Sequence, residues 1–165
     1  PLYTDSTASA TLTLTKADTT LTTSTFSGRP GDKKSLTATL KRNSDGAVVS
    51  TKTLTFKVDG TKIGTADTDG TGVATLSYKI LEAFSIGAHT LTVEFAGDGN
   101  HNASSGTGAL NINQAPVKIT QSNVVGNLGK AVKLSATLKR YTDNTAMSGK
   151  TLRFQVDGQN GHLTA

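Results

Sequence analysis

Hydrophobic and polar residues alternate in several short segments of the chain. In residues 35–42, Leu36, Ala38 and Leu40 alternate with two threonines and a lysine. Alternation with a period of two is the pattern of a β-strand that has one buried face and one face in solvent. This pattern predicts seven strands in the middle of the chain, at residues 20–25, 35–42, 53–58, around Ile63, 73–80, 88–95 and 109–113.

Turn signals separate these segments. Asp59-Gly60 is typical of a tight turn between two strands, and residues 68–72 (TDGTG) carry a second such signal. We interpret residues 80–86 as a loop that crosses between sheets. Thr and Ser supply 43 of the 165 residues, which suits strands and turns rather than a helical bundle. The pattern predicts an all-β fold, an antiparallel β-sandwich of the Greek-key type with about seven strands.

The chain also repeats itself at an offset of 98 residues, so that Leu36 meets Leu134. The strongest match pairs LTATLKR (36–42) with LSATLKR (134–140), within a longer alignment without a gap. Pro1 is not a natural start, which indicates a piece of a longer chain. We expect tandem repeats in three parts: the last strand of a preceding repeat (1–17), a complete domain (18–115) and the truncated N-terminal half of a following repeat (116–165).

Four segments of the middle unit resemble a known family. They are LTATL (36–40), KTLTFKVDGTKIGTA (52–66), TDGTGVATLSYKI (68–80) and GAHTLTVEFAGDGNHNASSGTGALNI (87–112). Together they resemble the bacterial immunoglobulin-like repeat domains of large secreted and cell-surface proteins. The resemblance implies an immunoglobulin-like sandwich, neighbouring repeats as partners, and an extracellular or cell-surface location. His101 stands where that family usually has a tyrosine.

Composition and charge exclude several classes of function. The formal net charge is +5, but lysines such as Lys52, Lys57 and Lys79 are scattered singly through the predicted strands. A nucleic-acid-binding surface more often clusters basic and aromatic residues, so we expect no nucleic-acid partner. No apolar run approaches the roughly 20 residues that span a bilayer, so we expect no membrane insertion. Cysteine is absent, which excludes disulfides and thiolate catalysis.

Candidate chemistry in the sequence is sparse. His89, His101 and His162 lack the spacing of zinc ligands, and we interpret His89 as a partly buried packing residue. Asp67 and Asp69 lie in a loop that partly matches a calcium-binding loop, but Tyr78 stands where the closing glutamate would be. No motif of a known catalytic site occurs. We therefore expect no enzyme, no catalytic residue and no cofactor, with Asp67 and Asp69 as the only metal candidates.

Two functions remain open on this evidence. The first is a structural spacer or stalk, since rigid repeated units with short linkers hold other parts away from a surface. The alternative is an adhesive module that binds a glycan or a protein through its loops. Residues 1–17 and 116–165 also carry apolar strand residues such as Leu12 and Leu14 without their partner strands. We expect these two segments to join different molecules head to tail by strand addition.

Overall fold

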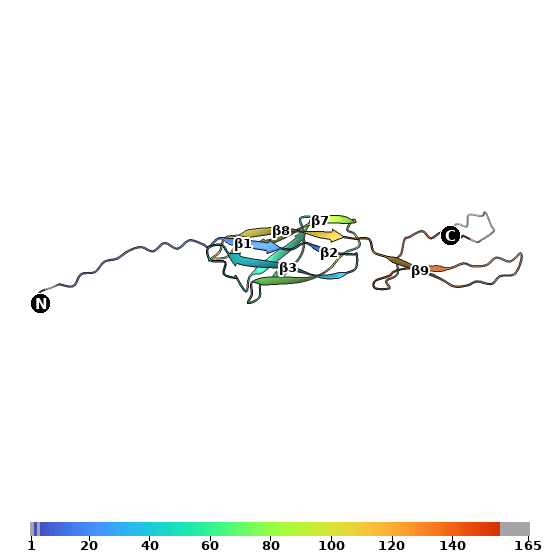
Figure 1. Cartoon of the computed structure of the whole chain (residues 1–165), viewed down its shortest axis with the longest axis horizontal. Helices are drawn as coiled ribbons and strands as arrows, with labels where there is room; N and C mark the ends of the chain where they lie inside the picture. Colours follow the sequence, from blue (N-terminus) through green and yellow to red (C-terminus); the bar gives the residue numbers. More distant parts are fainter. Residues whose placement is uncertain (1, 3, 156–165) are drawn as a thin grey trace.

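Two facing β-sheets form the body of the molecule (Figure 1). The structure is a computed structural model that describes residue 2 and residues 4–155. One sheet has three strands in the order β1-β3-β6, and the other has five in the order β2-β8-β7-β4-β5. The strands of these sheets are β1 (Thr19–Thr23), β2 (Phe26–Gly28), β3 (Lys33–Arg42), β4 (Thr53–Val58), β5 (Thr61–Asp67), β6 (Val73–Lys79), β7 (Gly87–Phe95) and β8 (Ser104–Ile112).

The strand pairing confirms the predicted all-β sandwich. Neighbouring strands run antiparallel in both sheets, except that β2 runs parallel to β8. Residues 81–86 contain turns and bends and connect β6 to β7, which lie in different sheets. The expected crossing loop is therefore present at this position.

Two strands differ from the prediction. The strand predicted at 20–25 is β1, and it is followed by the short strand β2, which was not predicted and belongs to the other sheet. Strand β8 begins at Ser104, before the predicted start at residue 109. A Cβ added at Gly106 would lie 2.3 Å from the carbonyl oxygen of Leu21. The early part of β8 thus has glycine because the backbone of β1 lies too close for a side chain. Without apolar side chains at these positions, this part of β8 lacks the alternation that predicts a strand.

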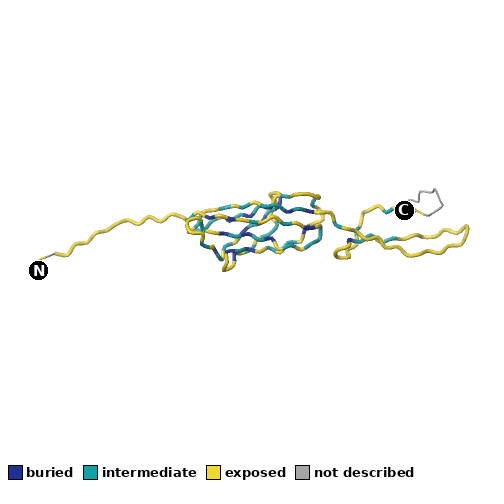
Figure 2. The backbone as a smooth tube through the Cα atoms, viewed as in Figure 1, coloured by how far each residue is buried: buried dark blue, intermediate teal, exposed yellow. Residues whose placement is uncertain are grey.

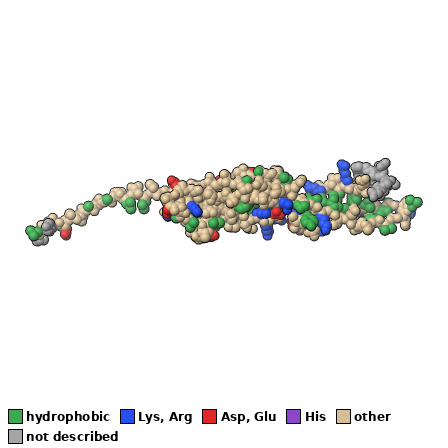
Figure 3. All heavy atoms as spheres, in the orientation of Figure 1, with side chains coloured by type: hydrophobic (Ala, Val, Ile, Leu, Met, Phe, Trp, Pro, Cys, Tyr) green, Lys and Arg blue, Asp and Glu red, His purple; other side chains and the backbone are tan. Residues whose placement is uncertain are grey.

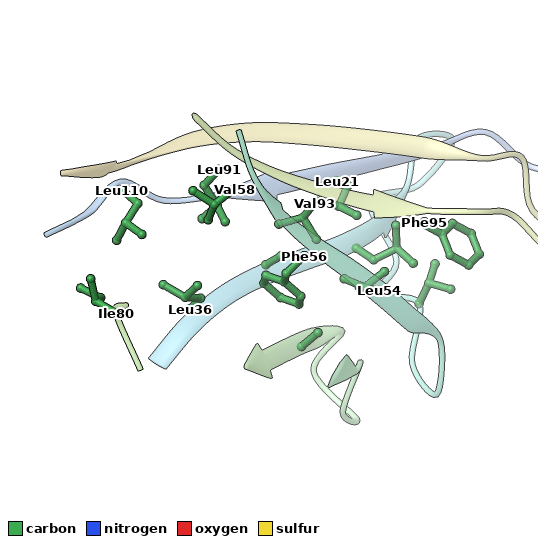
Figure 4. Close-up of a cluster of buried hydrophobic side chains, with 14 of the residues drawn as sticks. Leu21, Leu36, Leu54, Phe56, Val58, Ile80, Leu91, Val93, Phe95 and Leu110 are labelled. Carbon is green, nitrogen blue, oxygen red and sulfur yellow. The ribbon is translucent and has the colours of Figure 1, made fainter. Parts of the chain in front are cut away.

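The core lies between the two sheets, and the buried apolar residues of the described part of the chain all fall within residues 21–112 (Figure 4). Phe56 of β4 is fully buried at its centre, together with Leu54 and Val58 of the same strand. The threonines and lysine that alternate with them are half-buried or exposed, as the period of two predicts. The other buried apolar residues are Leu21, Leu36, Ala38, Leu40, Val49, Ala74, Ile80, Leu91, Val93, Phe95, Leu110 and Ile112.

The chain enters and leaves the sandwich at opposite ends (Figure 1). At the entry, the Ala17 amide donates to the carbonyl of Asn100 over 2.8 Å. At the exit, the Asn113 amide donates to the carbonyl of Gly28 over 2.8 Å. Residues 4–16 before the entry form no strand and are exposed, as the yellow tube in Figure 2 shows.

A second, smaller pair of strands follows the sandwich. It consists of β9 (Val117–Gln121) and β10 (Ala136–Arg140), which run antiparallel in a two-stranded sheet. Val117 lies opposite Arg140 in this pair, and Thr19 lies opposite Arg42 in the β1–β3 pair. Both positions differ by 98, so β9 and β10 pair in the register of β1 and β3.

Truncation of Phe56 should test the assignment of the core. The Phe56→Ala variant should lower the free energy of unfolding by about 3–5 kcal/mol, because it leaves a cavity between the sheets. The matched control is Thr65→Ala, on the exposed face of β5, which should stay within about 0.5 kcal/mol of the parent. Urea unfolding measures both. A loss below about 1 kcal/mol for Phe56→Ala would contradict the central position of this ring.

Candidate functional site

The carboxylate of the calcium candidate Asp67 bonds to the neighbouring strand β4, and that of Asp69 bonds within its own turn. Asp67 Oδ1 accepts a hydrogen bond from the Thr53 hydroxyl over 2.6 Å. Asp69 Oδ1 accepts hydrogen bonds from the Thr71 hydroxyl and from the amides of Thr71 and Val73, the two amides over 2.8 and 3.1 Å. The bond from the Thr71 hydroxyl, followed by those from the two amides, lowers the pKa of Asp69. The described residues contain no group of three or more His, Asp or Glu side chains suited to a metal ion. The geometry of residues 67–73 is thus accounted for by the turn itself.

His89 has a more defined environment than the packing role predicted for it. Its Nδ1 lies 2.6 Å from Asp59 Oδ2, and its Nε2 lies 2.9 Å from the carbonyl oxygen of Ser85. Both partners accept hydrogen bonds, so both ring nitrogens must donate, which requires the charged imidazolium. The carboxylate of Asp59 and then the Ser85 carbonyl raise the pKa of His89. The Phe84 ring packs edge-on against it, with the ring centroids 5.0 Å apart.

His101 belongs to a separate charged cluster at the entry to the sandwich. Its Nδ1 lies 3.0 Å from Asp98 Oδ1, and the Lys52 ammonium lies 2.7 Å from Asp98 Oδ2. The hydrogen bond from Lys52, followed by those of the Asn100 and His101 amides, holds the pKa of Asp98 well below its usual range. The structure therefore does not bring His89 and His101 together, and His162 lies outside the described residues.

The most constrained polar contact in the described residues joins the sandwich to the β9–β10 pair. The Arg140 side chain, at the end of β10, is only 5% exposed. Its Nη1 donates to the carbonyl oxygen of Pro30 over 2.6 Å, and its Nη2 lies 2.5 Å from Glu82 Oε1. Its Nε lies 3.1 Å from Asp143 Oδ1 on its own strand pair. We call Arg140 with these three partners the Arg140 clamp.

The sandwich is shaped to accept this guanidinium. Gly31 follows Pro30 in a turn with a φ of 91°, and a Cβ added there would lie 1.7 Å from Arg140 Nη1. Any side chain at position 31 would thus be strained and would displace the clamp. Arg29 of the same turn donates from Nε to the Gln114 carbonyl of the linker over 3.2 Å. Figure 3 shows basic and acidic side chains close together where the sandwich meets the β9–β10 pair.

The equivalent arginine of the sandwich, Arg42, lies at its opposite end. Its Nε donates to Asp45 Oδ1 over 2.9 Å, and its Nη2 also contacts the Asp45 carboxylate. These bonds lower the pKa of Asp45 to about 2. The Arg42 side chain is 39% exposed, against 5% for that of Arg140. Each arginine follows a lysine and is followed three residues later by an aspartate, a recurrence at the repeat offset from which no site was predicted.

A sequence profile of the bacterial Ig-like domain (group 3) matches residues 19–113. This segment contains both sheets of the sandwich and the whole core. The chain belongs to the bacterial Ig-like domain family. The family assignment confirms the resemblance stated from the sequence, and it covers the complete unit rather than β9 and β10. No curated protein matches the bacterial Ig-like chain.

Two solved structures are similar to this bacterial Ig-like chain. The first is of fibronectin(III)-like modules of CbhA from Clostridium thermocellum, with 22% identity and a TM-score of 0.43, covering 59% of this chain and 48% of that chain. The second is of the titin domains z1z2 in complex with telethonin, with 14% identity and a TM-score of 0.38, covering 87% and 76%. The chain spans about half the length of the CbhA chain that it matches.

The protonated His89 should make stability depend on pH. Its raised pKa means that the stabilisation is complete below the ordinary value of 6.5 and is lost as the pH rises through the folded-state value. The difference in unfolding free energy between the parent and His89→Gln should therefore shrink from about pH 6 to about pH 9. Urea unfolding across this range measures it. A constant difference would show that the pKa of His89 is the same in the folded and the unfolded protein.

Proposed function

We propose that the chain is a non-catalytic spacer from a tandem array of Ig-like units in an extracellular or cell-surface bacterial protein. Bacterial Ig-like domains typically occur in such proteins, and Ig-like domains are generally structural modules. In the part of the chain that the structure describes, no helix is long and apolar enough to cross a membrane. The observation that carries the proposal is the Arg140 clamp, which joins the sandwich to the β9–β10 pair.

The position of the termini supports this role. Ala17 and Asn113 lie at opposite ends of the sandwich, so each added unit lengthens the molecule instead of folding back on it (Figure 1).

The register of β9 and β10 supports the spacer role as well. At the offset of 98 residues, these strands reproduce β1 and β3 position by position, as the first strands of another unit would.

The linker between the units also suits a spacer. Only residues 113–116 separate β8 from β9, and Pro116 has a fixed φ. The Gln114 carbonyl accepts from Arg29, and the Pro116 carbonyl accepts from the Tyr141 amide over 2.9 Å. A short linker with both of these carbonyls bonded limits bending between the units.

Distance measurements between spin labels should test this role. The chain has no native cysteine, so labels can be placed at Thr65→Cys in β5 and Lys118→Cys in β9. A spacer should give a narrow distance distribution, and Arg140→Ala should broaden it because the clamp is lost. Lys62→Ala, on the exposed edge strand β5, is the matched control and should leave the width unchanged. A parent distribution as broad as that of Arg140→Ala would contradict the spacer role.

An adhesive role has less support. A sugar-binding surface needs exposed aromatic side chains that stack on the ligand. Among the large apolar side chains that are exposed in residues 2 and 4–155, the aromatic one is Tyr141, at the junction between the units. The loops of the sandwich therefore offer little for a glycan to stack on.

Head-to-tail strand addition between molecules is favoured by one observation. Strands β9 and β10 border an open groove of about 560 Å³, into which residues such as Ile119, Leu134 and Phe154 project. Leu12 and Leu14 are 82% and 84% exposed and could fill it in a second copy of the chain. Val156, another apolar residue of this half-unit, lies outside the described residues.

Light scattering across a concentration series tests this association. The chain should grow in mass with concentration, because a head-to-tail contact builds rings or open filaments rather than a closed dimer. Replacing Leu12 and Leu14 with serine should keep it monomeric. The control variant replaces the exposed Thr11 and Thr13 with serine and keeps Leu12 and Leu14. A monomeric parent at high concentration would contradict the association.

A further inference from the structure

We propose that Arg42 and Asp45 form a docking site for a preceding Ig-like unit, and that they bind its turn and loop as Arg140 binds Pro30 and Glu82. The partner is thus the exit end of another copy of this domain. This inference deepens the proposed spacer function and rests on it. It adds that Arg42 and Asp45, at the entry end of the sandwich, correspond to Arg140 and Asp143 and are free to bind a preceding unit.

The backbone around the two arginines is the same. The Arg42 amide donates to the carbonyl of Ala47 over 2.8 Å, and the Arg140 amide donates to that of Thr145 over 2.9 Å. In each turn the residue directly before that carbonyl has a positive φ, 68° at Gly46 and 59° at Asn144. Both arginines therefore leave the end of their strand from equivalent turns.

The surrounding contacts repeat in the same way. The Asn43 amide donates to the carbonyl of Asp18 over 2.9 Å, and the Tyr141 amide donates to that of Pro116 over 2.9 Å. These carbonyls belong to the first residue of each unit at the repeat offset. Each turn thus lies against the linker through which a preceding unit would be attached, and for Arg140 that unit is the sandwich.

The guanidinium group can make the change that docking requires. An arginine has five N–H donors. The Nε of Arg42 donates to Asp45, and the Nε of Arg140 lies 3.1 Å from the Asp143 carboxylate, also three residues later. In Arg42 the Nη2 group also bonds to Asp45, whereas in Arg140 the Nη2 group bonds to Glu82 of the sandwich. Docking would turn Nη2 from the aspartate to the partner's carboxylate, while Asp45 keeps the side chain extended toward the partner.

The binding turn recurs in the chain as well. In the sandwich the Asp32 amide donates to the carbonyl of Arg29 over 3.0 Å, which closes the turn around Gly31. In the following unit the Lys130 amide donates to that of Asn127 over 3.1 Å around Gly129, whose φ is 77°. A Cβ at Gly129 would meet nothing within 4 Å. This second turn has the open shape that an arginine from a further unit would need.

Exposure separates the occupied clamp from the free one. The Arg140 side chain is 5% exposed and the Arg42 side chain is 39% exposed, although both have an aspartate partner. The difference comes from Pro30 and Glu82, which cover Arg140 alone. Within the described residues Arg42 has no side-chain partner besides Asp45, so its outer surface is available to a preceding unit.

An elongated chain tests the proposal. A copy of residues 18–115 replaces residues 1–17, because position 17 corresponds to position 115 at the repeat offset. The core of the sandwich closes within residues 21–112, so each copy carries a complete fold. Spin labels at Thr65→Cys in the first and the second copy report on the new junction. In a second sample, labels at Thr65→Cys in the second copy and at Lys118→Cys report on the Arg140 junction.

Arg42→Ala in the second copy should broaden the distance distribution at the new junction, while Arg42→Ala in the first copy, which has no unit before it, should not. Arg42→Lys in the second copy should broaden it as well, because an ammonium cannot form the forked contact. An unchanged width for second-copy Arg42→Ala would overturn the inference. If Arg140→Ala still broadens its own junction in that case, the spacer function stands; if neither variant has an effect, both fail.

Discussion

Burial of one face of every strand between two sheets is the constraint on which the structure depends. Phe56 fills the centre of that layer, and the residues around it come from both sheets. A sandwich without cysteines has no disulfide to hold it together, so the alternation of apolar and hydroxyl side chains must be kept in each strand. The polar contacts at the two ends of the sandwich form between strands whose positions are already set by this core.

Sequence alone was sufficient for the parts of the fold that alternation controls. Strands β3, β4, β6 and β7 lie where the period of two places them, and their inward residues are the predicted ones. The early part of β8 could not be predicted from the pattern, because Gly106 is selected by the backbone of β1 rather than by burial of a side chain. Strand β2 was missed for a different reason, since its three residues are too few to show a pattern of alternation.

The site was harder to predict than the fold. Arg140 carries a charge in a region of scattered charges, and its burial depends on Pro30 and Glu82, which are distant in the sequence. Only the recurrence of an aspartate three residues after each arginine could have indicated a shared role. The partners of His89 were hidden in the same way, because Asp59 had been explained fully by its turn with Gly60.

The parallel pairing of β2 with β8 has a mechanical consequence. The chain enters the sandwich beside β1 and leaves it after β8 at the opposite end, so a pull along the molecule that extends past β1 slides β2 past β8. The hydrogen bonds between these strands are perpendicular to that force, so all of them bear the load at the same time. In a hairpin pulled from its open end, by contrast, the hydrogen bonds break one after another. A small domain without a covalent cross-link can therefore resist extension through the geometry of its terminal strands.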